Sequence, residues 1–374
     1  MPQTVFLHLG LPKTATTYLQ TLMWSDRDRL ADQGVLLPGR QRRDHLWASR
    51  AVRDDPRLDT FDESRRTAWD RIQADIAAWP GTSVISHEFF AAASAEQAER
   101  MVAALAPAEV HLVLTGREPV GMLASSWQES LKNRSSVTLR NFGRAPASDE
   151  PAAIWNWRTL DLRLVLERWG PAVPPERVHV LPLPGPGAPR TLIWERFAGL
   201  VGFDPAGFDP SASASNPSMG LVEAETLRRL NKHLRDEEFE TARDRARFIR
   251  TFLADRRLVT RRGEPFWPSQ SAIDDCRARG VATVEHIRAA GYDVIGDVED
   301  LLVPDVLEPR RTGSDITEAE VAEVAVELAG RLMHDVRSLT LTNDELVAEN
   351  RRLRAEAGLR GGVRKRFGRL RGPS

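Results

Sequence analysis

The chain is nearly devoid of cysteine and contains few lysines. Cys276 is the single cysteine in 374 residues, which excludes an internal disulfide framework and a cysteine-rich metal site and is typical of a reducing cytoplasm. Among the 52 lysine and arginine residues, only Lys13, Lys132, Lys232 and Lys365 are lysines. Because lysine is this rare, a lysine inside a motif is more informative here than usual.

Other classes of protein are excluded by what the sequence lacks. The net charge of −1 gives no overall bias toward nucleic acid, so we expect no nucleic-acid partner. The first 13 residues have no basic region before their short apolar stretch, so no signal peptide is predicted. No apolar run approaches the ~18 residues of a membrane span. We therefore expect a cytoplasmic protein.

Short strand-like runs alternate with helical patterns along most of the chain. This alternation predicts an α/β fold, with a parallel sheet flanked by helices, over residues 1–310. The expected strands are Thr4–Leu9, Thr82–Ser86, Val110–Thr115 and Arg177–Leu181. The expected helices are 18–34, Ser64–Trp79, 94–105 with a capping box from Ser94 and Gln97, Pro119–Lys132, Trp155–Trp169, and most of 220–290.

The C-terminal part has a different periodicity. Thr317 and Glu320 form a capping box at the start of a long helix. Leucine recurs every seventh residue in a pattern typical of a coiled coil over residues 314–359, at Leu332, Leu339, Leu346 and Leu353. Asn343 and Asn350 occupy the other core position of the heptad. Polar residues there favour two helices in register, which predicts a parallel homodimer. The alternative is that Leu332–Leu353 packs on its own chain.

The last segment, residues 360–374, is strongly basic. Its cations alternate with Val363, Phe367 and Leu370. A short basic amphipathic segment predicts weak contact with an anionic surface, such as the inner face of a membrane or an anionic glycan. A solubilising tail without a partner is the alternative.

The segment after the first expected strand is typical of an anion-binding loop. It reads GLPKTATT, residues 10–17, and precedes a helix. The amides of residues 14–17 are expected to be unpaired at the helix N-terminus, where the helix dipole favours negative charge. Lys13 adds a positive charge, and Thr16 and Thr17 add hydroxyl donors. The spacing is not that of a Walker A loop, because Lys13 follows Gly10 by only three residues. A solvated turn with capping threonines is the alternative.

HLGLPKTATTYLQ resembles the 5′-phosphosulfate loop of the PAPS-dependent sulfotransferase superfamily, particularly its bacterial branch (PAPS is 3′-phosphoadenosine 5′-phosphosulfate). The resemblance implies that PAPS binds to Pro12, Lys13, Thr14, Ala15, Thr16 and Thr17, with Lys13 also acting in catalysis. The family usually has glycine where Ala15 stands. Alanine makes a positive φ costly, whereas right-handed helical geometry at that residue would cost nothing.

A second motif of the same superfamily follows the third expected strand. Arg117, Pro119 and Ser125 match its 3′-phosphate motif in spacing. The resemblance implies that Arg117 and Ser125 bind the 3′-phosphate, which suits the planar guanidinium of arginine. Arg261 and Arg262 resemble a further phosphate-binding triplet of the cytosolic members.

The superfamily often places its catalytic base at the end of the second strand, where this chain has SHEFF, residues 86–90. Both His87 and Glu88 are therefore candidates. Successive strand residues face opposite sides, so we expect only one to enter the site, and we favour Glu88. His8 and His45 are weaker candidates, and His111 is expected to be a core residue.

These features predict transfer of a sulfuryl group from PAPS to an acceptor hydroxyl on a carbohydrate, a glycolipid or a secondary metabolite. No metal is expected. Trp127, Gln128 and Lys132 are expected near the nucleotide or acceptor, and Trp127, Trp155 and Trp157 could stack on a sugar. The alternatives are a P-loop kinase or phosphotransferase, although the chain lacks a Walker lysine followed by Ser or Thr and a Walker B aspartate, and a non-catalytic coiled-coil scaffold.

Overall fold

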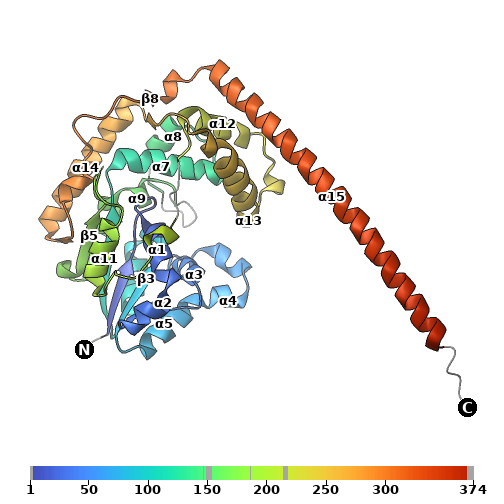
Figure 1. The fold of residues 1–374 in the computed structure, drawn as a ribbon. Helices are drawn as coiled ribbons and strands as arrows, with labels where there is room; N and C mark the ends of the chain where they lie inside the picture. The colour runs from blue at the N-terminus through green and yellow to red at the C-terminus, as the bar shows by residue number, and fades with distance from the viewer. Residues whose placement is uncertain (1–2, 146, 149–153, 186, 214–217, 369–374) are drawn as a thin grey trace, which may run out of the picture. The chain divides into compact units, whose positions relative to one another are not determined.

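A parallel six-stranded sheet forms the centre of the N-terminal unit. The computed structural model describes residues 3–145, 147–148, 154–185, 187–213 and 218–368. The strands, in the order β2-β3-β1-β4-β5-β7, are β2 (Val35–Leu36), β3 (Thr82–Ser86), β1 (Thr4–His8), β4 (Glu109–Gly116), β5 (Val178–Pro182) and β7 (Asp293–Val294). Every neighbouring pair is parallel. The predicted α/β fold with a parallel sheet flanked by helices is confirmed (Figure 1).

Helices cover the sheet because each has an apolar side to bury. One face carries α1 (Thr16–Ser25), α2 (Arg27–Asp32) and α11 (Leu192–Val201), whose buried side chains share a cluster with Phe6 and Val84 of the sheet. α10 (Leu162–Trp169) packs against β4, and α6 (Ala95–Ala103) and α14 (Gln270–Ala290) pack against α10. The capping box of Ser94 and Gln97 at the start of α6 is formed as predicted.

Three predicted helices are each divided into two, and in two of them an aspartate side chain caps the second helix. The expected helix 18–34 ends at Ser25, because the Asp26 side chain accepts a hydrogen bond from the Arg29 amide and starts α2. The helix predicted over 64–79 consists of α4 (Glu63–Arg66) and α5 (Ala68–Ala78). The helix predicted over 155–169 consists of α9 (Trp157–Leu160) and α10, with the Asp161 side chain capping α10. Such side chains compete for backbone amides, which a periodicity pattern does not detect.

Several other elements of the N-terminal unit follow the carboxyl ends of the strands or line the cavity described below. A 3₁₀ segment, η2 (Glu88–Ala92), follows β3, and α7 (Pro119–Lys132) follows β4 as predicted. Further elements of this unit are α3 (Arg42–Val52), η1 (Pro56–Thr60), α8 (Leu139–Arg144), α12 (Leu221–Asn231), α13 (Ala242–Asp244), the π-helix Arg245–Leu258, a two-stranded sheet of β6 (Phe266–Trp267) and β8 (Arg311–Thr312), and several short 3₁₀ segments.

The chain divides into two compact units, Met1–Ile316 and Thr317–Ser374. The second unit contains α15 (Glu318–Gly368), whose predicted capping box is present: the Glu320 carboxylate accepts from the Thr317 amide, and the Thr317 hydroxyl accepts from the Glu320 amide. The helix continues through Gly361 and Gly362, where the basic tail was expected to begin.

The leucine repeat of α15 is mostly exposed. Leu339, Leu346 and Leu353 are 67%, 63% and 53% exposed. Homodimer formation through these residues stays a prediction, as does contact of the tail with an anionic surface. Arg369 and Arg371 of that tail lie outside the described residues. No described helix is both long and apolar enough to cross a membrane.

Candidate active site

The three sequence motifs meet at one edge of the sheet. In the strand order β3-β1-β4, the residue His8 at the end of β1 pairs with Ser86 on one side and Val113 on the other. Because all three strands are parallel, the loops after them leave from the same edge. The anion loop thus lies between the segment that carries Glu88 and the segment that carries Arg117. Ligands of open α/β sheets bind at such positions, where the connections diverge.

The loop between β1 and α1 has the geometry of an anion cradle. Lys13 and Ala15 have left-handed backbones, with φ of 66° and 62°. Hydrogen bonding within α1 begins at Leu19, whose backbone amide donates to the Ala15 carbonyl. The five amides from Lys13 to Thr17 donate no hydrogen bond to any described residue. This arrangement fits the binding of a phosphate or a similar anion.

Ala15 therefore adopts the geometry that costs an L-residue energy, and not the right-handed one that would cost nothing. A left-handed backbone costs a non-glycine residue about 1–2 kcal/mol. We expect Ala15→Gly to raise the free energy of unfolding by about 0.5–1 kcal/mol, since the extra freedom of glycine in the unfolded chain offsets part of the gain. Urea denaturation measures this. Ala77→Gly, at an exposed site within α5, should lower stability instead; equal effects of the two changes would contradict strain at Ala15.

A buried polar network supports the loop from below. His8 Nδ1 lies 2.8 Å from Ser86 Oγ, and His8 Nε2 lies 3.2 Å from Thr115 Oγ1. Thr14 is fully buried, and its hydroxyl donates to the Leu11 carbonyl. The Thr14 side chain therefore holds the loop and does not line the cavity described below. Burial lowers the pKa of His8 to about 3, so this side chain is neutral.

His45 supports the end of β3. Its Nδ1 accepts from the Ser86 amide at 3.1 Å, and its Nε2 is 2.8 Å from the Pro38 carbonyl, so Nε2 carries the proton. Burial lowers the pKa of His45 to about 4. His8 and His45 are thus fully buried structural residues. His111, expected in the core, stacks on His179 with ring centroids 5.2 Å apart.

The two buried histidines predict an acid-sensitive fold. Their pKa values in the folded protein, about 3 and about 4, lie below the value near 6.5 of an unfolded histidine. The unfolded state therefore binds more protons, and stability is lost as the pH falls from about 6.5 toward 4, by up to about 1.4 kcal/mol per pH unit for each histidine. We expect the urea midpoint to fall over this range. His8→Asn should reduce the slope, and an unchanged slope would contradict a neutral buried His8.

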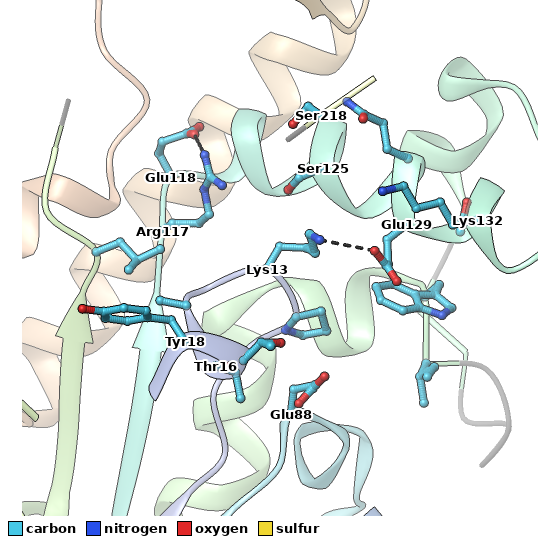
Figure 2. A pocket seen from close by; sticks show the side chains of 18 of the residues that line it. Lys13, Thr16, Tyr18, Glu88, Arg117, Glu118, Ser125, Glu129, Lys132 and Ser218 are labelled. Carbon is cyan, nitrogen blue, oxygen red and sulfur yellow. Dashed lines mark hydrogen bonds and ion pairs between the residues drawn. The ribbon is translucent and has the colours of Figure 1, made fainter. Parts of the chain in front are cut away.

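Lys13 points into the site and forms an ion pair across it. Its Nζ lies 3.3 Å from Glu129 Oε2 of α7 (Figure 2). Arg250 of the π-helix forms an ion pair with the other oxygen of the same carboxylate. Burial opposes ionisation of Glu129, but the hydrogen bond from Arg250 and the charges of Lys13, Arg250 and Lys132 hold its pKa at about 2. The carboxylate is therefore charged and links the loop to two other elements.

Arg117 and Ser125 lie on the other side of Lys13 from Glu88 (Figure 2). Arg117 follows β4, and its Nη2 donates to Glu118 Oε1 at 3.2 Å. Glu118 in turn caps α7 by accepting from the Gly121 amide. Ser125 lies about two turns into α7, and its hydroxyl donates to the Gly121 carbonyl at 2.7 Å. Both side chains line the same cavity as Lys13.

Glu88 and His87 have different environments. Glu88 lines the cavity, and its Oε2 atom is buried without a hydrogen bond in the described part of the chain. His87 does not line the cavity, and its Nδ1 accepts from the Phe89 amide at 3.1 Å, which caps η2. Nε2 then carries the proton of the neutral ring. Burial lowers the pKa of His87. Of the two residues, Glu88 lines the cavity and His87 does not, and Glu88 Oε2 lies 3.8 Å from His87 Nδ1.

The cavity measures about 2320 Å³. A site for one small ligand usually measures ~300–1,000 Å³, so there is room for two ligands. Pro12, Ala15, Thr16 and Thr17 also line it, as do Gln128, Lys132 and Trp155. Trp127 and Trp157 are buried in the core, with their Nε1 atoms bonded to the Val137 and Gly143 carbonyls.

Arg261 and Arg262, which resemble part of a phosphate-binding triplet, do not line the cavity. Arg261 forms an ion pair with Glu223.

Sequence reasoning missed Glu129 and Arg250 as partners of the loop. It also missed four arginines on the wall near Glu88. In the described ranges, no three His, Cys, Asp or Glu side chains gather as a metal-binding group.

Comparisons with known proteins give distant structural likenesses. No family model and no curated protein matches the chain. A sulfotransferase from Alicyclobacillus acidocaldarius is 16% identical with a TM-score of 0.40, over 57% of this chain and 87% of that one. The sulfotransferase domain from the Curacin biosynthetic pathway is 12% identical with a TM-score of 0.33, over 57% of this chain and 81% of that domain. At these scores the function has to be argued from the site itself.

Proposed function

We propose that this protein is a PAPS-dependent sulfotransferase that acts on an acceptor hydroxyl. The observation that carries the proposal is the set of five amides, residues 13–17, that donate no hydrogen bond to any described residue, flanked by Arg117 and Ser125 on one side and by Glu88 on the other. In the proposal this set serves as two separate anion sites and a base in one cavity. The donor has two anionic ends and the reaction needs a base, so each part has a use.

Each residue has a distinct part in the proposed reaction. The amides of residues 13–17 and Lys13 hold the 5′-phosphosulfate, and Arg117 and Ser125 hold the 3′-phosphate. Glu88 takes the proton of the acceptor hydroxyl as its oxygen forms a bond to sulfur. The bond from sulfur to the bridging oxygen breaks, and adenosine 3′,5′-bisphosphate leaves. Lys13 and the amides stabilise the charge that develops on the leaving phosphate oxygen.

Calorimetric titration with nucleotides tests the proposal. We expect adenosine 3′,5′-bisphosphate to bind without Mg²⁺ and ATP to bind more weakly with or without Mg²⁺, because a 3′-phosphate is needed to engage Arg117. Tighter binding of ATP in the presence of Mg²⁺ would favour a kinase or phosphotransferase. Binding of neither nucleotide would favour a scaffold whose function is carried by α15.

Arg117→Ala should mainly weaken nucleotide binding. Removal of a charge-assisted contact costs about 1.5–3 kcal/mol, which is a rise of roughly 10- to 150-fold in the Kd of adenosine 3′,5′-bisphosphate. Calorimetry measures this Kd. Arg177→Ala, before β5, is the matched control because this arginine does not line the cavity. A Kd equal to that of the unmodified protein would rule out the 3′-phosphate role of Arg117.

A further inference from the structure

Arginine side chains form the cavity wall next to Glu88. Arg42 and Arg50 of α3, and Arg53 and Arg57 around η1, line the same cavity as Lys13. Three of these guanidinium groups converge on the buried carboxylate of Asp55, which forms ion pairs with Arg50, Arg53 and Arg57.

This wall lies on the β3 side of the anion loop, away from the motif that carries Arg117. α3 packs against η2, the segment that begins with Glu88. After burial, the positive charges of Arg53, Arg42 and Arg50 contribute to the lowered pKa of His87, which places these charges close to the end of β3. Arg117 follows β4, on the opposite side of β1. The arginine wall therefore lies on the Glu88 side of the anion loop, and not on the side of Arg117.

Two of these arginines have donor capacity left for a ligand. Arg42 is exposed, and in the described residues its guanidinium forms one hydrogen bond, to the Thr21 hydroxyl at 3.3 Å, and no ion pair. Arg50 reaches Asp55 at 3.4 Å through Nη1, while its Nη2 donates no hydrogen bond to any described residue. Arg50 is held in place because it lies over the rings of Trp47 and Phe61. A preorganised cation loses little entropy when it binds an anion.

We infer that Arg42 and Arg50 form an acceptor subsite for anionic groups, so that the preferred acceptor carries a carboxylate, phosphate or sulfate ester besides the hydroxyl that is modified. This inference rests on the proposed function for the role of acceptor. The binding of an acidic ligand at this wall can be measured independently of it. A neutral acceptor would form no charge-assisted contact with these guanidinium groups, so the subsite discriminates against it.

Binding of paired sugars tests the subsite. We use protein saturated with adenosine 3′,5′-bisphosphate, so that the nucleotide site is filled, and titrate it with D-glucose 6-phosphate, D-glucose 6-sulfate, D-glucuronate and D-glucose, observed by NMR. We expect at least one acidic sugar to bind about tenfold or more tighter than D-glucose, as charge-assisted contacts allow. The ranking of the three acidic sugars separates phosphate, sulfate ester and carboxylate.

Variants assign the binding to this wall. Arg42→Gln with Arg50→Gln should bring the preference for acidic sugars below about twofold, and Arg42→Gln alone, an exposed change, should reduce it without affecting the fold. Arg43→Gln is the matched control, since Arg43 is an exposed neighbour on α3 that does not line the cavity. Equal binding of acidic and neutral sugars, or an unchanged preference in the variants, overturns the inference. If the nucleotide itself fails to bind, the proposed function is wrong, and the sugars are compared on the nucleotide-free protein and its variants.

Discussion

Lys13→Ala should lower kcat by about 10²–10³, the usual effect of removing a preorganised donor from a developing negative charge. The fold should be unaffected, because Glu129 keeps Arg250 as an ion-pair partner when the lysine is removed. The measurement is the initial rate of sulfuryl transfer from PAPS at saturating donor, together with the urea midpoint.

Lys232→Ala is the control for the first prediction. Lys232 is exposed and does not line the cavity, so its removal should leave the rate unchanged. If Lys13→Ala retains nearly full turnover, Lys13 has no role in stabilising the leaving phosphate, and the loop is a structural turn.

Glu88→Gln should abolish sulfuryl transfer and leave the Kd of adenosine 3′,5′-bisphosphate unchanged or lowered. Glutamine has nearly the same shape but cannot take a proton, and its neutral side chain removes a negative charge that repels the phosphates. Rates and calorimetric Kd values from the same preparation provide the comparison. A tenfold or smaller loss of rate would argue against Glu88 as the base.

The neighbouring histidine provides the matched comparison. His87→Asn keeps a side chain that can accept from the Phe89 amide, so the cap of η2 is preserved while the imidazole is lost. We expect a mild effect on the rate. If His87→Asn abolishes turnover and Glu88→Gln does not, His87 is the catalytic base and Glu88 is not.

The central strands could be predicted because they are short apolar runs between clear turn signals. β1, β3, β4 and β5 all lie within a residue or two of the expected ranges. The edge strands β2 and β7 contain two residues each, too few for any periodicity. The division of the helices was not predicted because it depends on the Asp26 and Asp161 side chains accepting hydrogen bonds from backbone amides. Hydrophobic periodicity carries no information on these bonds.

The site could be predicted where its residues follow strand ends in sequence. Lys13, Glu88 and Arg117 belong to this class, since parallel strands bring their ends together. The arginine wall could not be found this way, because arginine is common throughout the chain and only the folding of α3 and η1 brings Arg42 and Arg50 to the cavity. Glu129 was also missed, because its partners Lys13 and Arg250 are distant in sequence.

The carboxylate of Glu129 competes with any anion at the loop for Lys13. Where an anion takes Lys13 out of its ion pair with Glu129, the energy of that pair is subtracted from the measured affinity of the anion. By reciprocity, whatever strengthens the contact between Glu129 and Arg250 frees Lys13 and favours the anion. The affinity of the loop for its ligand is therefore a property shared with the π-helix Arg245–Leu258, more than a hundred residues away along the chain.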